Sequence, residues 1–432
     1  MNGITCASTV KGGFCIGCGI CRAACPYGAI RMVSGRDLVA RPIIDKARCT
    51  SCGLCANFCP NAPDKINALA EKAAETCGVQ PITGEETSPH CFIAWDGTNP
   101  EGRRRSASGG IATKLALCLL ADGRIDAVIH AKRVVSGRGR PHGTAALSRT
   151  SAEIEKGRGS IYEPIDFSEV LLSLEEGGRY FMTGTPCVIR GAKRLFAEHP
   201  RYRTMRLYSC ALICSHNVTP QFADFFADRR RISAAARYTV DFRDKTGIPN
   251  AVNFNSCYMA EDGSLLFRKN RNKCGWTKFW RSYAFALSAC CKCPDFWCLD
   301  ADISVKDAWG KKEWTSDPLG RSVVIVRGAE MLEAFNACGF SASSLDPSEV
   351  AQMQKPQLEY KLNSAKDKLS KPILSISNVR NGHFLKLCTA EMSRWVYAHI
   401  GAFATAALLK IVVLISSGGK KCQKRNNNER SA

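Results

Sequence analysis

Two cysteine ladders near the N-terminus constrain this chain more than any other feature. Both have the spacing C-x2-C-x2-C-x3-C-P, which is the ligand spacing of paired 4Fe–4S clusters. Each position of the second ladder lies 34 residues after its counterpart, which indicates an internal duplication. Structural disulfides or zinc sites are disfavoured, because zinc ligands have different spacings. The first ladder contains Cys15, Cys18, Cys21 and Cys25, and the second contains Cys49, Cys52, Cys55 and Cys59.

The duplication predicts a bacterial-type ferredoxin domain over residues 1–66 that carries two 4Fe–4S clusters and transfers electrons. In such a domain three cysteines of one ladder bind a cluster, and the fourth ligand comes from the other ladder. Gly19 and Gly53 lie inside the ladders, where the backbone has to pass close to inorganic sulfide. We expect cluster one to be bound by Cys15, Cys18, Cys21 and Cys59, and cluster two by Cys49, Cys52, Cys55 and Cys25.

The composition favours a cytoplasmic protein with anionic partners. The N-terminus lacks the basic and apolar succession of a signal peptide, and 24 cysteines suit a reducing compartment. The formal net charge is +21, and the basic residues are dispersed. An anionic cofactor, an acidic redox partner or a membrane surface would each account for this charge. Nucleic-acid binding is not expected, because no aromatic-and-basic reading module accompanies the charge.

After a loop rich in Gly, Pro, Ser and Thr over residues 78–89, strand and helix patterns alternate. The patterns predict helices over 111–121 and 188–196, and strands over 127–131, 179–184 and 203–213. Residues 240–254 and 265–268 indicate antiparallel additions. The predicted fold class is therefore α+β or α/β: a ferredoxin fold, then a mixed α/β domain, then a helical C-terminal tail.

The tail, residues 346–432, begins with a polar helical stretch over 350–378 and contains an apolar segment over 395–417. A lysine near the centre of a membrane-spanning helix costs about 2.5–3.5 kcal/mol, so Lys410 argues against a span. His399 and Lys410 fall on one helical face. That pattern fits either a helix lying in a membrane surface or a helix packed on the protein itself. Peripheral membrane contact therefore stays open.

Five short motifs after residue 90 resemble the coenzyme F420 hydrogenase/dehydrogenase beta-subunit family. The resemblance covers about residues 90–345, with an N-terminal part over 90–175 and a C-terminal part over 176–345. Lys306 stands where the family usually has glycine, so a long cation enters a loop expected near the cofactor. The motifs are Ser106-Ala-Ser-Gly-Gly-Ile111, Gly184-Thr-Pro-Cys187, Cys214-Ser-His-Asn-Val-Thr-Pro220, Phe242-Arg-Asp-Lys-Thr-Gly247, and Cys290-Cys-Lys-Cys293 followed by Ala301-Asp-Ile-Ser-Val-Lys-Asp-Ala-Trp-Gly310.

The resemblance implies a flavoprotein that binds FAD beside a further 4Fe–4S cluster. Ser108, Gly109 and Gly110 precede a helix and would offer backbone N–H groups to a pyrophosphate. Arg243 and Lys245 would face the flavin or deazaflavin ring. For Asp302 and Asp307 we expect loop-ordering and cofactor-ribose roles. The third cluster would be bound by Cys187, Cys214, Cys290 and Cys293, although Cys210, Cys291 and Cys298 are close enough in sequence to replace a ligand.

These features predict an iron–sulfur flavoprotein oxidoreductase. It would pass electrons between 4Fe–4S clusters and FAD, and exchange them with a deazaflavin, coenzyme F420, or another small organic acceptor or donor. No catalytic side chain is assigned, because the cofactors carry the chemistry. Two alternatives stay open. The chain could be an electron-transfer subunit docked to an acidic redox partner without its own substrate, or a ferredoxin-domain scaffold that binds no flavin.

Overall fold

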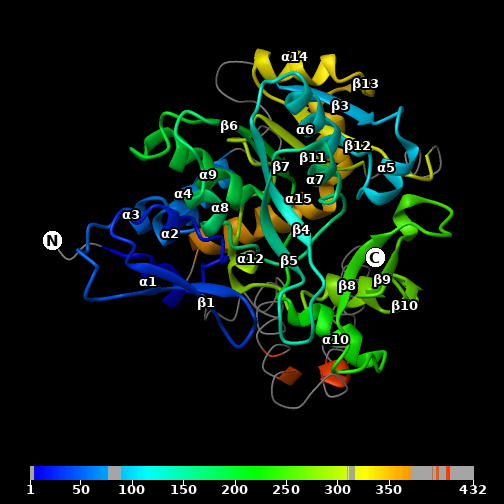
Figure 1. The fold of residues 1–432 in the computed structure, drawn as a ribbon, viewed down its shortest axis with the longest axis horizontal. Coiled ribbons are helices and arrows are strands. Elements are labelled where there is room, and N and C mark those ends of the chain that lie inside the picture. Colours follow the sequence, from blue (N-terminus) through cyan, green and yellow to red (C-terminus); the bar gives the residue numbers. More distant parts are fainter. Residues whose placement is uncertain are drawn as a thin grey trace, which may run out of the picture.

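The computed structural model describes residues 4–75, 89–308, 310 and 317–370, together with 392, 396–397 and 405–408. Most of the apolar segment predicted over 395–417 lies outside the described residues, and its membrane contact stays a prediction. Within the described ranges, no helix is both long enough and apolar enough to cross a membrane. The overall architecture, a ferredoxin-like unit joined to a mixed α/β domain, confirms the predicted fold class (Figure 1).

The N-terminal unit shows the duplication that the ladders predict. Gly19 and Gly53 each stand in the left-handed conformation, with φ of 77° and 78°, and each starts a four-residue helix that carries the third cysteine of its ladder. The hairpin β1–β2 pairs in antiparallel register, with Ile30 opposite Ile44. The elements are α1 (Cys6–Lys11), α2 (Ile20–Ala23), β1 (Ile30–Ser34), β2 (Ala40–Ile44), α3 (Leu54–Asn57) and α4 (Pro63–Glu75).

An eight-stranded sheet forms the centre of the α/β part. Its strands are β3 (His90–Trp95), β4 (Ala127–Arg133), β5 (Gly143–Ser148), β6 (Arg179–Gly184), β7 (Arg206–Leu212), β11 (Ile303–Asp307), β12 (Ser322–Val326) and β13 (Ser341–Leu345). The order is β13-β3-β12-β11-β7-β6-β4-β5, and the four strands β11, β7, β6 and β4 run parallel. Because the carboxyl ends of parallel strands meet at one edge, the loops that follow them share one end of the sheet.

Helices cover both faces of this sheet (Figure 1). On one face, α9 packs in a core that continues into the ferredoxin unit through Ile20 and Phe58. On the other face, α6 and α14 pack in a second core that includes Leu115 and Phe335. The predicted helix over 111–121 and the predicted strand over 179–184 are confirmed with the same bounds. The helices are α5 (Pro100–Arg105), α6 (Ile111–Ala121), α7 (Ser151–Glu155), α8 (Ser168–Leu172), α9 (Pro186–Glu198), α14 (Ala329–Ala337) and α15 (Pro347–Ser370).

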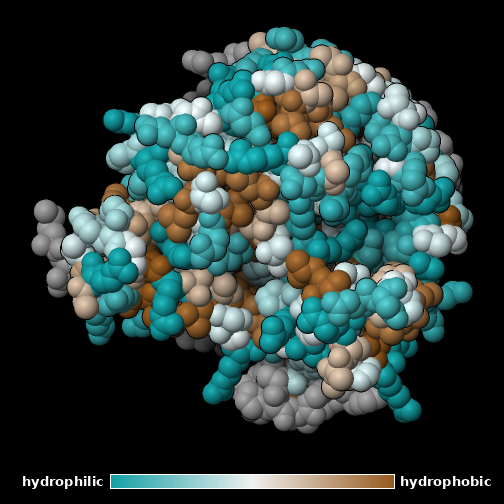
Figure 2. Space-filling model, viewed as in Figure 1, coloured by the Kyte–Doolittle hydropathy of each residue, from teal (hydrophilic) through white to brown (hydrophobic). Residues whose placement is uncertain are grey.

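A second lobe holds the antiparallel additions. Its three-stranded sheet has the order β10-β9-β8 and packs against α10 and α11 in a core dense in aromatic side chains, among them Phe222, Phe225 and Tyr258. The space-filling view is hollowed between this lobe and the region of α5 (Figure 2). The elements are α10 (Gln221–Arg229), β8 (Tyr238–Asp244), β9 (Asn255–Ala260), β10 (Leu265–Asn270), α11 (Trp276–Arg281) and α12 (Ser288–Lys292).

The ferredoxin unit lies close against the α/β part at two glycines. A Cβ atom on Gly191, in α9, would come within 2.4 Å of Ile20 Cδ1. A Cβ atom on Gly19 would come within 2.0 Å of Asp166 Oδ1, just before α8. The requirement for glycine at position 19 therefore includes this contact between the two parts, in addition to the backbone conformation. Arg190 adds a polar link, since its guanidinium donates to the Pro60 carbonyl at 3.1 Å.

Candidate redox site

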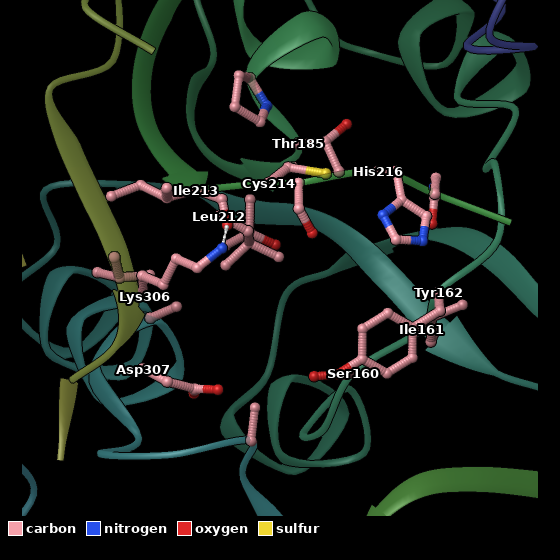
Figure 3. Close-up of a pocket in the computed structure, with 18 of the residues that line it drawn as sticks. Ser160, Ile161, Tyr162, Thr185, Leu212, Ile213, Cys214, His216, Lys306 and Asp307 are labelled. Atoms are coloured by element: carbon pink, nitrogen blue, oxygen red, sulfur yellow. Dashed lines mark hydrogen bonds between the residues drawn. The ribbon is translucent and has the colours of Figure 1, made fainter. Parts of the chain in front are cut away.

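A cavity of about 1070 Å³ opens at the carboxyl ends of the parallel strands. This is at the upper limit of ordinary ligand pockets, which measure roughly 300–1,000 Å³. Its lining comes from the start of α6, the loops after β6, β7 and β11, the second lobe, and α15. In the close-up, Lys306 and Asp307 face the cavity from one side, and Tyr162 and His216 face it from the other (Figure 3). The sheet thus gathers residues from distant parts of the chain around one space.

The predicted pyrophosphate turn forms one wall. Gly110 has φ 81° and begins α6, and no side chain caps this helix end. Ser108 and Gly110 line the cavity. Gly109 does not line it, because its N–H donates to Ser322 Oγ at 3.1 Å and a Cβ would come within 2.6 Å of the Ala94 carbonyl. Gly109 therefore lets the turn lie flat on the sheet, and the free end of α6 offers backbone N–H groups to an anion.

Arg243 and Asp307, both predicted site residues, meet at the cavity. Arg243 Nη1 lies 2.9 Å from Asp307 Oδ2, and Nη2 donates to the Ala107 carbonyl at 2.6 Å. Its guanidinium also lies 4.4 Å from the ring centroid of Phe254. Both residues line the cavity, and Arg243 is buried. Arg243 therefore holds the Ser-Gly-Gly turn and Asp307 together while presenting positive charge to the cavity.

Lys245, predicted to face a ring, is placed elsewhere. Its Nζ donates to the carbonyls of Leu319 at 2.6 Å and Arg103 at 3.0 Å, and it does not line the cavity. Burial lowers the pKa of Lys245 to about 7. The physical reason for the different placement is that β8 ends at Asp244, so Lys245 lies in the turn that follows and strand alternation does not extend to it. Lys245 therefore stabilises the Ser-Gly-Gly turn through hydrogen bonds outside the cavity.

Asp302 also lies away from the cavity. Its Oδ2 accepts hydrogen bonds from the backbone N–H and hydroxyl of Ser209, both at 2.7 Å, and Oδ1 pairs with Lys193 at 2.8 Å. These contacts tie the start of β11 to β7. The expected loop-ordering role fits this position, but the expected cofactor-ribose role does not, because Asp302 does not reach the cavity.

The four cysteines predicted for a third cluster line the same cavity. Cys187 lies in the first turn of α9, Cys214 follows β7, Cys290 lies in α12, and Cys293 ends α12. Burial raises the pKa of the Cys187 thiol to about 12, and burial also raises the pKa values of Cys214 and Cys290. The backbone N–H of Asn217 donates to Cys290 Sγ at 3.3 Å. Thiolates at these buried positions would be costly unless a nearby positive charge, such as a bound metal, balanced their negative charge.

The three alternative ligands do not reach this cavity. Cys210 is buried in β7, Cys291 is buried in α12, and Cys298 Sγ donates to the Pro186 carbonyl at 3.6 Å. Among the cysteines of this region, the structure therefore brings together the four that the motifs favour.

The ferredoxin cysteines lie close together, and one of the two expected ligand groups lines a small cavity of its own. A small cavity is lined by Cys25, Cys49, Cys52 and Cys55, the expected ligands of cluster two. Burial and the nearby Cys59, the expected fourth ligand of cluster one, raise the pKa values of the Cys15 and Cys18 thiols. Cys187 of the third group packs against the core that contains Cys18. Cys52 is exposed. Among the described side chains, no group of three His, Cys, Asp or Glu residues is arranged to hold a single metal ion.

Comparisons with known proteins agree with the motifs. A model described as the N-terminal part of the coenzyme F420 hydrogenase/dehydrogenase beta subunit matches residues 93–172, and the model of its C terminus matches residues 177–345. Together they cover more than half of the 432 residues. The chain belongs to this beta-subunit family. A 4Fe–4S dicluster domain matches residues 14–62. Family and dicluster domain together identify an iron–sulfur oxidoreductase that transfers electrons.

One solved structure is similar over much of the chain. It comes from the F420-reducing nickel–iron hydrogenase complex of Methanosarcina barkeri, in a study of xenon derivatization. The sequence identity is 18% and the TM-score is 0.45, and the match covers 64% of this chain and 91% of that chain. A comparison with curated proteins gives no match. The family assignment rests on the family models and on the motifs.

Two lysines of this family member approach the third cysteine group. Lys306 Nζ donates to the Ile213 carbonyl at 3.2 Å, next to Cys214 (Figure 3). Burial lowers the pKa of Lys306 to about 8. Lys361, from α15, is also buried and lines the cavity. Sequence reasoning noticed Lys306 from its place in a motif, but it missed Lys361, which lies in a polar stretch beyond residue 345 and matches no motif.

Aromatic side chains of the second lobe form a further wall that the motifs did not reveal. The His216 ring lies between Trp280 and Tyr283, with centroids 4.0 Å and 4.2 Å away. Trp276 stacks on Trp280 at 4.9 Å with an interplanar angle of 9°. All four line the cavity, and the Arg271 guanidinium lies 5.6 Å from the ring of Trp276. Aromatic faces of this kind suit stacking by a planar ring system, and the Arg271 cation beside them would balance negative charge on such a ring.

Glu163 is the carboxyl group of the cavity whose pKa is raised most clearly among the described residues. Burial raises the pKa of Glu163 to about 7. The backbone N–H groups of His142, at 2.6 Å, and Gly143 donate to its Oε1. A carboxyl group near neutrality in a cavity can hold or release a proton at working pH. The sequence carried no signal for it, since its pKa depends on burial.

Proposed function

We propose that this protein is an iron–sulfur flavoprotein oxidoreductase that passes electrons between 4Fe–4S clusters and FAD, and between FAD and a small organic acceptor or donor. The observation that carries the proposal is a shared cavity. The third cysteine group, the free N-terminal end of α6 and the aromatic wall all line it. Cys18 of the ferredoxin unit and Cys187 of the cavity belong to the same core, and Ile16 and Asn61 of the ferredoxin unit line the cavity. A path for electrons would thus lead from the ferredoxin unit, through the third cysteine group, to the part of the cavity beside the aromatic wall.

The cysteines fit three clusters. When bound, 4Fe–4S clusters exchange single electrons, and their potentials follow net charge, hydrogen bonds to sulfur and solvent exposure. Cys52 is exposed whereas Cys18 is buried, so cluster two would lie nearer to solvent and cluster one deeper in the protein. Cys187 stands at the start of α9, where the helix dipole favours a thiolate. The chain's own contribution is the fixed spacing of these groups, supported by Arg190, which pairs with Asp295 and bonds to Asn61 at 3.3 Å.

The rest of the cavity fits FAD. Within the described part of the chain, Arg243 Nε, Trp276 Nε1, and the Oε1 atoms of Gln354 and Gln357 are buried without a hydrogen-bond partner, and all four residues line the cavity. A polar ligand would satisfy them. FAD, when bound, connects one-electron and two-electron chemistry. The start of α6 would bind the pyrophosphate, Arg243 would balance negative charge, and Glu163 would hold or release a proton at its carboxyl group.

The test is the content of iron, sulfide and flavin in anaerobically purified protein. We expect about 12 iron atoms and about one FAD per chain, which corresponds to three 4Fe–4S clusters. A Cys293→Ser variant should lose about four iron atoms and stop electrons from the ferredoxin unit from reaching the flavin. Cys298→Ser is the control, because Cys298 does not line the cavity. About eight irons without flavin in the unaltered protein would contradict the proposal.

The exposed end of the ferredoxin unit favours a second role, exchange of electrons with a redox protein. Cys52 is exposed, and Ile4 and Tyr27 beside it are 71% and 48% exposed. The net charge of +21 suits a partner with an acidic surface. If the protein were only such a subunit, the flavin would be reduced through the ferredoxin unit but would react with no small acceptor. A screen of free deazaflavin, nicotinamide and quinone acceptors separates the two roles.

A further inference from the structure

Helix α15 follows the family-matched region, which ends at residue 345, and closes the cavity. It packs against α4 of the ferredoxin unit and against α12. Val350 and Leu358 join a buried cluster with Ile213, next to Cys214, and with Phe296, next to the Cys290–Cys293 loop. Gln354 Nε2 donates to the Asp307 carbonyl at 3.0 Å. The helix is thus fixed to both sides of the third cysteine group.

Lys361 lies on the same face of α15 as these contact residues. Positions 350, 354, 357, 358 and 361 repeat at helical spacing, so they share one side of the helix. Lys361 is only 2% exposed and lines the cavity together with Cys214, Cys290 and Cys293. Helix α15 contacts α12, which carries Cys290 and is followed by Cys293, so Lys361 enters the cavity next to the element that holds these cysteines. Lysine is ordinarily charged at neutral pH, so its side chain brings an ammonium group into the part of the cavity that the cysteines line.

We propose that Lys361 is a positioning residue that holds a buried positive charge against the third cluster and raises its reduction potential. This rests on the proposed function, because it requires the third cluster. One-electron reduction adds one negative charge to a cluster, so a nearby cation stabilises the reduced state more than the oxidised state. Burial strengthens this effect, since charges interact more strongly away from water. Lys361 ligates no iron and acts through its charge.

The experiment is a redox titration of the purified full chain, followed by electron paramagnetic resonance, with iron content measured on the same samples. Lys361→Met removes the charge and keeps most of the side-chain length. Lys361→Arg keeps the charge. Lys355→Met is the matched control on the same helix, because the Lys355 side chain is 67% exposed and pairs only with Glu359 at 3.8 Å among the described residues.

We expect Lys361→Met to keep its iron and to shift the ratio of oxidised to reduced third cluster at a fixed potential by at least tenfold toward the oxidised form, which is 59 mV for a one-electron couple. Lys361→Arg and Lys355→Met should match the unaltered protein. Loss of the cluster in Lys361→Met alone would also support a charge role. An unchanged potential in Lys361→Met, or cluster loss in both Lys361 variants, would overturn it. About eight irons in the unaltered protein would instead refute the proposed function.

Discussion

Gly191 offers a direct test of how the ferredoxin unit is held against the α/β part. It lies in the middle of α9, where a Cβ atom would come within 2.4 Å of Ile20 Cδ1 and 3.1 Å of Pro60 Cδ. Ordinary contact begins at 3.4 Å, so any side chain at this position is about 1 Å too close to a residue that is fully buried. Ile20 follows Gly19 in the first ladder, and Pro60 follows Cys59. Gly191→Val should therefore displace Ile20 and Pro60, which adjoin the ligand segments expected for cluster one.

The expected cost follows from the packing. Inserting side-chain atoms into a well-packed core costs about 1–3 kcal/mol. Valine forms helices slightly better than glycine, which returns a few tenths of a kcal/mol. We expect Gly191→Val to weaken the packing of the two parts by about 2 kcal/mol, which is roughly a 30-fold change in the equilibrium between packed and separated states.

Two measurements check this value. Anaerobic thermal unfolding, followed by cluster absorbance and by tryptophan fluorescence, should show one shared transition in the unaltered protein and an earlier loss of cluster absorbance in Gly191→Val. Reduction of the flavin through the ferredoxin unit should slow, while its direct chemical reduction should not. Gly137→Val is the control, because a Cβ there would meet only the Ala236 carbonyl, at 3.9 Å. If both variants behave alike, α9 and the ferredoxin unit are not tightly packed, and the reasoning fails.

Three further predictions concern single side chains. The pKa of Glu163 is about 7 in the folded state against an ordinary 4.5, so the free energy of unfolding should fall by up to about 3 kcal/mol as pH rises from 4.5 to 7. Anaerobic urea unfolding of Glu163→Gln at pH 5 and pH 8 should lose this pH dependence. An unchanged dependence in the variant would contradict the prediction. The Cys6 thiol packs in one buried cluster with Cys21 and Cys55, the expected ligands of different clusters, and a thiol is a weak hydrogen-bond donor. Cys6→Ala should therefore lower both ferredoxin potentials at constant iron content, and unaltered potentials would count against this contact. Arg243→Met should raise the Kd for FAD about tenfold or more, because it leaves Asp307 unpaired. The Kd is measured by flavin fluorescence, with the exposed Arg237→Met as the control. Equal affinities of the two variants would show that Arg243 is not part of the flavin site.

The sequence was most informative where structure depends on local spacing. The two ladders predicted the 4Fe–4S dicluster domain, because its ligand spacing is contained in the duplicated pattern alone. The helix over 111–121 was recovered because its apolar residues recur at helical spacing after a glycine that adopts positive φ. Its neighbours in space were not predictable. Strand β3 pairs with β12, more than 200 residues away, and no local signal fixes that pairing.

The direction of single side chains was harder to predict, because it depends on burial and on where a strand ends. Arg243 and Lys245 are two residues apart, so regular alternation places both on one strand face. Strand β8 ends at Asp244, however, so the alternation does not extend to Lys245: Arg243 faces the cavity, whereas Lys245 donates to three carbonyls. Asp302 and Asp307 share a motif, but they lie at opposite ends of β11, and only the carboxyl end reaches the cavity. A motif predicts which residues matter more reliably than it predicts which way they point.

The charge of the chain gains a specific meaning from the structure. The composition left three explanations for the positive charge: an anionic cofactor, an acidic partner or a membrane surface. Among the described residues, four cations line the cavity and are at least half-buried: Arg243, Arg271, Lys306 and Lys361. Of the two aspartates in the lining, Asp307 pairs with Arg243, whereas Asp295 pairs with Arg190. Burying a cation without a partner is costly, and the cost falls when an anion occupies the same space. Because thiolate-bound clusters and a pyrophosphate are both anionic, the cavity itself favours the first explanation, and we expect removal of its ligands to destabilise the fold.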